Sequence, residues 1–410
     1  MSMNQTPSGE RTHIAIFGRR NVGKSSLTNA LTGQEVSIVS PVKGTTTDPV
    51  RKAMELLPLG PILIIDTAGL DDEGELGAQR VRRTRDILKQ ADIAILVTDA
   101  ETGLGGCEQE LAAQVRAKNI PLMVVFNKTD LAAPSTAMRQ QAAEQAQAPV
   151  FAVSSAAKEG IEELKLALAR MVPEHEGQRR LVADLLRPND VVVLVTPIDS
   201  AAPKGRLILP QQQVARDILD TGAVAVVARE TELRAALASL GRKPRLVVTD
   251  SQAFELVAAE VPADVPLTSF SILFARYKGD LAELVRGAQA VAKLRDGDRV
   301  LIAEGCTHHR QKDDIGTVKI PRWLKQHTGR NLVLEYSSGM AYPRELKEYA
   351  LAVHCGACML NRREMHWRIR QAQDAGVPIV NYGVLIAYLH GILPRCLAPF
   401  PDAAAVLTAS

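Results

Sequence analysis

The feature that most constrains the fold is a phosphate-loop sequence near the start of the chain. The apolar run 13–17 predicts a short buried strand, and Gly18-Arg-Arg-Asn-Val-Gly23-Lys24-Ser25-Ser26 follows it directly. This string matches G-x-x-x-x-G-K-[ST], and residues 27–31 after it have the pattern of a helix. Glycines let the backbone wrap around phosphate oxygens, so that amide N–H groups and the helix N-terminus face the negative charge. The order strand, loop, helix predicts an α/β phosphate-loop domain with a mostly parallel sheet flanked by helices.

Five residues are predicted to act on the phosphates or on the Mg²⁺ bound to them. Lys24 is expected to reach the β and γ phosphates, and Ser25 to place its hydroxyl on Mg²⁺. Thr46, in the run Gly44-Thr-Thr-Thr-Asp48, is a candidate ligand of the same Mg²⁺. The apolar strand 63–66 ends in D-x-x-G, where Asp66 is predicted to hold a metal-bound water and the Gly69 amide to contact the γ phosphate. The predicted catalytic residues are Lys24, Thr46, Asp66 and Gly69.

Two later motifs predict that the base is guanine. Asn127-Lys-Thr-Asp130 follows an apolar strand, and the Asp130 carboxylate can accept from N1–H and the 2-amino group of guanine. Adenine presents neither donor, and an unpaired buried carboxylate costs about 1–3 kcal/mol. Ser154-Ser155-Ala156 follows the strand 150–153 and completes the pocket. The predicted nucleotide-binding residues are Gly18, Asn21, Val22, Gly23, Lys24, Ser25, Ser26, Asp66, Asn127, Lys128, Asp130, Ser154, Ser155 and Ala156.

Length and charge limit the remaining possibilities. A chain of 410 residues is too long for one compact core and suggests two to four domains. A net charge of +3 gives no general attraction to nucleic acid or to an anionic membrane, so neither partner is expected. No N-terminal targeting segment and no long apolar run are apparent, which predicts a cytoplasmic protein. Five cysteines, three of them clustered, favour reduced thiols that bind metal over a disulfide framework.

The chain is expected to form three consecutive α/β domains. A polar run at 173–180 lacks apolar periodicity and predicts a boundary after the GTPase-like part at 1–173. From Val191 onward short apolar strands alternate with helical patterns, which predicts a small parallel α/β domain at 181–265. It contains no catalytic cluster, so we expect a dimerisation or interaction domain. A Rossmann-like metal-binding domain is predicted at 266–410.

The last domain carries the candidate metal ligands. The strand 298–303 is expected to lead to Cys306 and His308, and the strand 349–353 to His354, Cys355 and Cys358. Carboxyl ends of parallel strands meet at one edge of a sheet, so ligands far apart in sequence can converge there.

The number of thiolates favours iron over zinc. Three cysteines suit a 4Fe-4S cluster with one exchangeable iron position, whereas structural zinc usually takes two tight ligand pairs. His308 and His354 are candidates for the fourth ligand or for support of a neighbouring ligand. Glu304 and His309 are secondary candidates.

The nucleotide motifs resemble the translation-factor-like GTPases of the branch that contains the tRNA-modification GTPase and Era, over roughly residues 12–172. In that branch an asparagine at the position of Asn21 helps to hold K⁺ against the phosphates, which implies K⁺ activation. Leu70 stands where many GTPases carry the water-orienting glutamine. Intrinsic hydrolysis is therefore expected to be slow.

The C-x-H and H-C-x-x-C motifs behind such a GTPase resemble the HydF family of hydrogenase maturation factors over the whole chain. This resemblance implies a homodimer whose three cysteines bind a 4Fe-4S cluster. It also implies a scaffold or carrier that receives a diiron subcluster precursor from radical-SAM maturases and passes it to the apoprotein of FeFe-hydrogenase. GTP hydrolysis would then be a timing signal.

Two other functions use the same residues differently. A ribosome- or tRNA-directed GTPase would hold structural zinc and bind RNA, and a redox sensor would gate GTP hydrolysis by losing its cluster. The metal content of the protein distinguishes zinc from iron.

Overall fold

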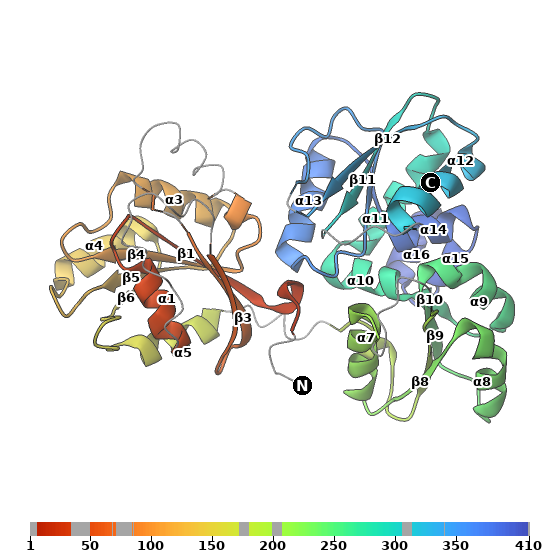
Figure 1. Cartoon of the computed structure of the whole chain (residues 1–410), viewed down its shortest axis with the longest axis horizontal. Coiled ribbons are helices and arrows are strands. Elements are labelled where there is room, and N and C mark those ends of the chain that lie inside the picture. The colour runs from red at the N-terminus through yellow and green to blue at the C-terminus, as the bar shows by residue number, and fades with distance from the viewer. Residues whose placement is uncertain are drawn as a thin grey trace. The chain divides into compact units, whose positions relative to one another are not determined.

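The computed structural model describes residues 6–33, 50–67, 69–70, 84, 86–171, 180–198, 207–305, 314–339 and 341–408. The chain divides into two compact units, Met1–Gln178 and Arg179–Ser410, and each is described by itself. Figure 1 labels the helices and strands of both.

The first unit is built on a six-stranded sheet with the order β2-β3-β1-β4-β5-β6. β2 is antiparallel to β3, and the other neighbours are parallel. Parallel strands buried on both faces need continuous apolar runs, and residues 14–17 of β1 are fully buried. The strands are β1 (Thr12–Gly18), β2 (Val50–Leu56), β3 (Gly60–Asp66), β4 (Ile93–Asp99), β5 (Leu122–Asn127) and β6 (Val150–Ala152).

Helices cover both faces of this sheet. Ile14 and Ile16 of β1 pack toward Leu27 and Leu164 on one face, whereas Ala15 and Phe17 pack toward Leu111 and its neighbours on the other. This is the alternation expected of a strand between two helical layers. The first face carries α1 (Lys24–Thr32) and α5 (Ile161–Met171), and the second carries α3 (Gly106–Ala117) and α4 (Thr136–Ala146).

The second unit contains two parallel four-stranded sheets with the orders β10-β9-β7-β8 and β12-β11-β13-β14. The middle sheet consists of β7 (Val191–Val195), β8 (Val224–Ala228), β9 (Leu246–Thr249) and β10 (Leu267–Ser269), with helices α7 (Leu209–Leu219), α8 (Leu233–Ser239) and α9 (Phe254–Glu260). The C-terminal strands are β11 (Arg299–Glu304), β12 (Val333–Ser338), β13 (Leu351–His354) and β14 (Ile379–Asn381). The C-terminal helices are α10 (Phe270–Lys278), α11 (Leu281–Gln289), α12 (Ile320–Thr328), α13 (Arg362–Asp374), α14 (Tyr382–Leu389), α15 (Leu393–Leu397) and α16 (Pro401–Thr408).

One continuous core joins these two sheets. Val192 and Leu194 of β7 belong to the same buried cluster as Phe270 and Phe274 of α10 and Val300 of β11. The opposite face of the middle sheet has its own core with α8 and α9. α10 therefore packs between the middle sheet and the C-terminal sheet, within a single compact unit.

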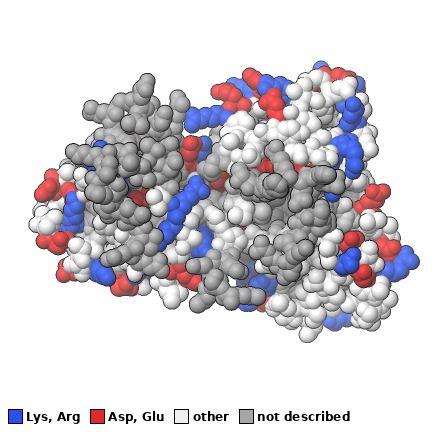
Figure 2. Space-filling model, viewed as in Figure 1, with Lys and Arg blue, Asp and Glu red and all other residues white. Residues whose placement is uncertain are grey.

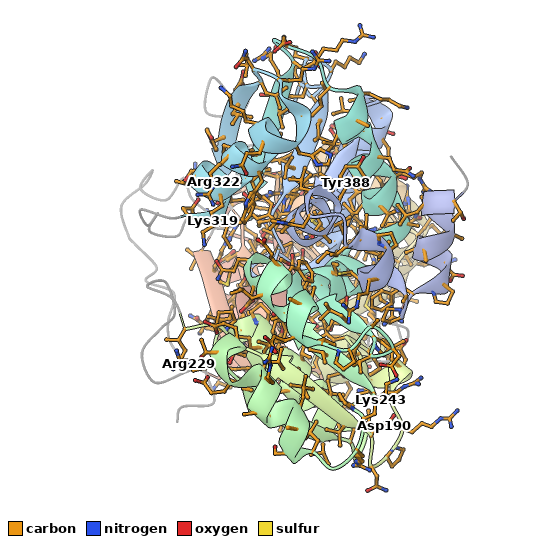
Figure 3. The ribbon with its side chains drawn as sticks, turned by 90° about the vertical axis from the view of Figure 1, so that its right-hand side faces the viewer. Asp190, Arg229, Lys243, Lys319, Arg322 and Tyr388 are labelled. Carbon is orange, nitrogen blue, oxygen red and sulfur yellow. The ribbon has the colours of Figure 1, made fainter. Side chains whose placement is uncertain are left out.

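Figure 3 shows Arg229 after the carboxyl end of β8, and Asp190 and Lys243 before the amino ends of β7 and β9.

Polar contacts also link the two sheets of this unit. Lys319 lies at the start of α12 near Arg322, and its Nζ donates to Oε1 of Gln252 at 2.8 Å. Gln252 follows β9, so α12 is tied to the carboxyl edge of the middle sheet.

The predicted fold class is confirmed: three successive α/β regions, the first a phosphate-loop domain and the others parallel. β2, β4, β10 and β12 were not predicted. The ranges 1–173, 181–265 and 266–410 stay predictions, and β10, which extends the middle sheet, lies just after the second of them.

The described surface is mixed in charge. Figure 2 shows basic and acidic side chains on the visible face of each unit. Among the described residues, no helix has both the length and the apolar character needed to cross a membrane.

Candidate functional site

Glycines lie at both ends of the phosphate loop, between β1 and α1. φ is +152° at Gly18 and +90° at Gly23, values that L side chains rarely adopt. A Cβ at Gly23 would lie 2.3 Å from Nδ2 of Asn127, and one at Gly18 would lie 2.3 Å from the carbonyl oxygen of Val97. Asn21 is exposed at φ +61°, which asparagine tolerates. The loop shape therefore depends on glycine at both ends.

Lys24 lies inside this loop. Its buried Nζ donates to the carbonyl oxygens of Gly18 at 3.0 Å and Arg19 at 2.7 Å. The ammonium is thus held where the loop backbone turns, which is the position the phosphate-binding role requires. Val22 is buried in the core next to α1, and Ser26 is exposed on α1.

Ser25 and Asp66, two residues predicted to serve Mg²⁺, are in direct contact. Oγ of Ser25 donates to Oδ2 of Asp66 at 2.7 Å. Oδ1 of Asp66 is buried and has no hydrogen-bond partner among the described residues. Burial raises the pKa of Asp66, while the Ser25 hydroxyl and the Lys24 charge lower it. A hydroxyl beside an under-satisfied carboxylate fits a hard cation such as Mg²⁺.

The D-x-x-G segment packs against the phosphate loop. Thr67 donates through Oγ1 to the carbonyl oxygen of Ile16 at 2.8 Å, and the Leu70 amide donates to the carbonyl oxygen of Gly18 at 3.2 Å. Gly69 lies between these two attachments. Thr46 lies outside the described residues, so its role stays a prediction.

Asn127 connects the phosphate loop to the base pocket. Its Nδ2 donates to the carbonyl oxygens of Val22 and Gly23 at 3.1 and 3.2 Å. Its Oδ1 accepts from the amide and hydroxyl of Ser155 at 3.1 and 2.9 Å. The side chain is 1% exposed, so this buried amide aligns three loops at once.

Asp130 is oriented by a neighbouring serine. The hydroxyl of Ser154, itself fully buried, donates to Oδ1 of Asp130 at 2.5 Å. Lys128 has φ +60°, and its Nζ lies 3.4 Å from Oδ2 of Asp99. Ala156 is exposed at the end of the pocket loop. The two motifs predicted to hold guanine are therefore in contact with each other.

An ion pair beside the phosphate loop was missed by sequence reasoning. Nε of Arg19 lies 2.7 Å from Oε1 of Glu108, whose side chain is 1% exposed and also accepts from the Gly105 amide at 3.1 Å. The pair joins the loop to the start of α3. No sequence signal could have found it, because the motif leaves position 19 unspecified.

The predicted metal ligands that the structure describes lie at the carboxyl edge of the C-terminal sheet. β11, β13 and β14 are parallel neighbours, with Ala303, His354 and Asn381 in register. Cys355 follows β13 directly, and Cys358 lies half-buried in the next turn. Among the described residues no group of three or more His, Cys, Asp or Glu forms a metal site. Cys306, His308 and His309 lie outside those residues.

The surroundings of Cys355 suit a metal-bound thiolate. Its Sγ accepts from the Gly305 amide at 3.1 Å and from the Ala357 amide at 3.5 Å. Burial raises the pKa of the Cys355 thiol to about 11, and a coordinated metal would deprotonate it. N–H···S bonds of this kind are typical of iron–sulfur sites. The described donors therefore fit the predicted 4Fe-4S group.

His354 is fully buried, and both of its ring nitrogens have partners. Nη1 of Arg368 lies 3.0 Å from Nε2, and Nδ1 lies 2.9 Å from the carbonyl oxygen of Cys355. Burial, and then the Arg368 charge, lower the pKa of His354 to about 3. A neutral ring that accepts at Nε2 and donates at Nδ1 supports the Cys355 backbone. Iron coordination by His354 stays a prediction.

Two buried cations near this loop were also missed. Arg368 of α13 is 1% exposed and binds Glu364, the carbonyl oxygen of Gly339 and the face of Tyr342. Lys278 of α10 is 2% exposed. A lysine at the end of a largely apolar helical run is a sequence signal that could have indicated this buried cation.

Glu304, a secondary candidate ligand, is 4% exposed at the end of β11. A Cβ at Gly316 would lie 2.8 Å from its Oε1 and 2.4 Å from the hydroxyl of Tyr382. Burial raises the pKa of Tyr382 well above its ordinary value, and nearby Cys355 and Glu304 add to the shift. Glu304 therefore lies in the same region as Cys355.

Three domain families match this chain. The family described as 50S ribosome-binding GTPase matches residues 13–128. The hydrogen maturase F dimerization domain matches residues 181–279, and the hydrogen maturase F tetramerization domain matches residues 282–399. The last two together cover more than half of the 410 residues.

Curated relatives match the N-terminal part. The tRNA modification GTPase MnmE of Dechloromonas aromatica is 34% identical over 175 residues, 42% of this chain and 37% of the relative. That of Burkholderia mallei is 37% identical over 171 residues, 41% of this chain and 36% of the relative. The match thus spans little more than a third of these relatives.

Part of this chain is similar to solved structures. Era from Aquifex aeolicus has a TM-score of 0.37 at 21% identity, covering 53% of this chain and 92% of that chain. The FeoB G-domain from Methanococcus jannaschii has a TM-score of 0.31 at 27% identity, covering 40% and 98%.

The nucleotide motifs are assembled around one loop, and the GTPase family and relatives match that same part of the chain. The first domain is therefore a GTPase-family domain. With two further domain families specific to hydrogen maturase F, the chain belongs to the hydrogen maturase F family.

Proposed function

We propose that this protein is a K⁺-activated GTPase that holds a 4Fe-4S cluster and carries the diiron precursor in the maturation of FeFe-hydrogenase. The observation that carries the proposal is Sγ of Cys355, which accepts from the amides of Gly305 and Ala357 at the carboxyl edge of a parallel sheet. Cys306, Cys355 and Cys358 would hold the cluster. When bound, the cluster supplies an iron position with an exchangeable ligand.

The nucleotide residues have separate roles in this proposal. Lys24 and the Gly69 amide would stabilise negative charge on the γ phosphate, while Ser25 and Thr46 would hold Mg²⁺ and Asp66 would accept from a water near it. Water attacks the γ phosphorus, and the bond to the bridging oxygen of GDP breaks. Because Leu70 cannot orient that water, the charge supplied by K⁺ at Asn21 compensates.

We propose a homodimer that forms through the edge strand β8. β8 ends the middle sheet, and Val224 and Val227 on it are 45% and 48% exposed. An edge strand presents unpaired backbone groups to a second strand, and the matched dimerization domain includes β8. A chain that remains monomeric at micromolar concentration in gel filtration would contradict this.

The partners follow from the family. We propose that apo-hydrogenase and radical-SAM maturases bind this protein in the cytoplasm, where GTP is available and thiols stay reduced.

The metal content tests the cluster. Full-length protein purified without oxygen should be brown and contain about four irons per chain. Cys355→Ser should lose most of that iron, whereas Cys107→Ser, at an exposed cysteine in the GTPase domain, should retain it. A colourless wild type containing zinc would refute the proposal and favour the RNA-directed alternative.

Transfer tests the carrier role. Cluster-loaded protein that has been incubated with the maturases should activate an apo-hydrogenase, and Cys355→Ser should not. If the wild type holds iron but never activates the hydrogenase, a redox sensor becomes the better explanation.

Monovalent cations test the K⁺ site. GTP turnover should be at least about tenfold faster in K⁺ than in Na⁺ at equal ionic strength, because one stabilising charge near the γ phosphate changes rates by that order or more. Asn21→Ala should abolish the difference. Asn119→Ala, at another asparagine with positive φ, should preserve it. Equal wild-type rates in the two salts would exclude K⁺ activation.

A further inference from the structure

Lys278 is a buried cation directly behind the cysteine loop. It ends α10, whose sequence Phe-Ser-Ile-Leu-Phe-Ala-Arg-Tyr-Lys is largely apolar, and only 2% of the lysine is exposed. Its Nζ also lies 5.6 Å from the centre of the Phe274 ring. Removing an ammonium from water is costly unless its hydrogen bonds are replaced. The hydrogen-bond partners of Lys278 should therefore indicate the role of this buried ammonium.

The cysteine loop provides those contacts. Nζ of Lys278 donates to the carbonyl oxygens of Leu360 at 2.8 Å, Cys358 at 3.2 Å and Ala357 at 3.3 Å. An ammonium has three N–H donors, so three converging carbonyl groups match its capacity. One side chain therefore binds the backbone of the C-x-x-C turn and of Leu360, two residues before α13.

These bonds orient the two sides of the loop differently. The carbonyl oxygens of Ala357, Cys358 and Leu360 accept from Lys278, while the amides of Gly305 and Ala357 donate to Sγ of Cys355. Ala357 has φ +54°, a conformation that costs on the order of 1 kcal/mol for alanine. Lys278 is thus placed to stabilise a turn that would otherwise be strained.

Lys278 and the cysteine loop belong to two different matched domain families. Lys278 belongs to the segment matched by the dimerization domain, whereas Cys355 and Cys358 belong to the segment matched by the tetramerization domain. The cysteine loop is therefore held by a residue from the preceding domain family, on a helix whose apolar residues pack into the core shared by the two sheets.

We propose that Lys278 is a positioning residue for the iron–sulfur cluster: it holds the C-x-x-C turn and places a positive charge beside the bound cluster. This inference rests on the proposed function. A 4Fe-4S core held by three thiolates is an anion, and its negative charge grows by one unit on reduction. A nearby buried cation stabilises the reduced form more than the oxidised form, and so raises the reduction potential.

The test compares neutral and charged replacements in the full-length chain. Wild type, Lys278→Met, Lys278→Gln and Lys278→Arg are reconstituted without oxygen using ferrous iron and sulfide. Iron per chain is measured, and reduction by dithionite is followed by EPR at controlled potentials. Lys293→Met, which removes an exposed lysine from the same unit, is the matched control.

We expect Lys278→Met to retain less iron. Its remaining cluster should show at least a tenfold lower ratio of reduced to oxidised form at a fixed potential, which equals about 59 mV for one electron. Lys278→Arg should stay close to wild type, and Lys293→Met should not differ from it. Iron content and potential in Lys278→Met equal to those of the wild type would overturn the proposal.

Folding is followed separately by circular dichroism of the apo-proteins. If Lys278→Met does not fold, Lys278→Gln, which keeps a hydrogen-bond donor without the charge, replaces it in the comparison. If both neutral variants fail to fold while Lys278→Arg folds, the lysine serves the core and the proposal is wrong. A wild type that binds no cluster refutes the proposed function itself, which is a different result.

Discussion

Gly23→Ala should lower the affinity for GTP by at least about 100-fold, measured as the Kd of a fluorescent GTP analogue. The added Cβ would lie 2.3 Å from Nδ2 of Asn127, closer than real Cβ contacts come. Asn127 cannot simply move away, because its amide group binds Val22, Gly23 and Ser155 together. Displacing it should disturb the phosphate loop and the base pocket at once. Misplacement of this size at a preorganised site costs two orders of magnitude or more.

Gly33→Ala is the control for backbone strain. Gly33 ends α1 at φ +65°, and a Cβ there would meet no atom within 4 Å. This variant should lose about 1 kcal/mol of stability while its GTP affinity stays within about twofold of wild type. If the two variants lose affinity equally, the contact with Asn127 is not the cause.

Asp130→Asn should reverse the base preference from guanine to xanthine. The Ser154 hydroxyl donates to Oδ1 of Asp130 at 2.5 Å, and asparagine can keep this bond. Its Nδ2 would then face the base, where guanine presents donors and xanthine presents a carbonyl oxygen. A site built around one hydrogen-bond pattern rejects the wrong pattern by about 10⁴-fold. The measurement is the ratio of Kd values for GTP and XTP.

Glu144→Gln, which removes an exposed carboxylate of α4, should leave that ratio unchanged. Ser154→Ala should weaken binding of both nucleotides without reversing the preference, because it frees the carboxylate but keeps its charge. An Asp130→Asn protein that still prefers GTP would show that the base is recognised elsewhere.

Two of the four missed strands, β10 and β12, give no clear pattern in the sequence, whereas β4 is buried along its whole length and was missed as well. β10 has three residues, Leu267–Ser269, and runs directly into α10, so it is too short for a periodic signal. β12 is an edge strand with Val333 47% exposed and Tyr336 41% exposed. Edge strands bury little surface, and their sequences are correspondingly less apolar. The strands that were predicted, such as β1, β7 and β11, are buried on both faces and read as continuous apolar runs.

The side-chain contacts around the two sites depend on tertiary structure to different degrees. In the GTPase domain each motif follows its own strand, and parallel strands end at one edge. The contacts Ser25–Asp66 and Asn127–Ser155 could therefore be expected from the motifs alone. Lys278 contacts the cysteine loop and Arg368 contacts His354 from helix positions that no motif specifies. Their burial depends on how α10 and α13 pack, which is set by many weak apolar contacts.

The sequence by itself determined the GTPase site, the α/β class of all three regions and the cysteine motif, because short motifs and apolar runs are local. Only the tertiary structure decided what surrounds Cys355: two amides on sulfur, a neutral His354 paired with Arg368, and Lys278 on three carbonyl groups. The physical reason is that a buried charge is tolerated only where its hydrogen bonds are replaced. For Lys278, the replacement hydrogen bonds come from residues about 80 positions away in the chain.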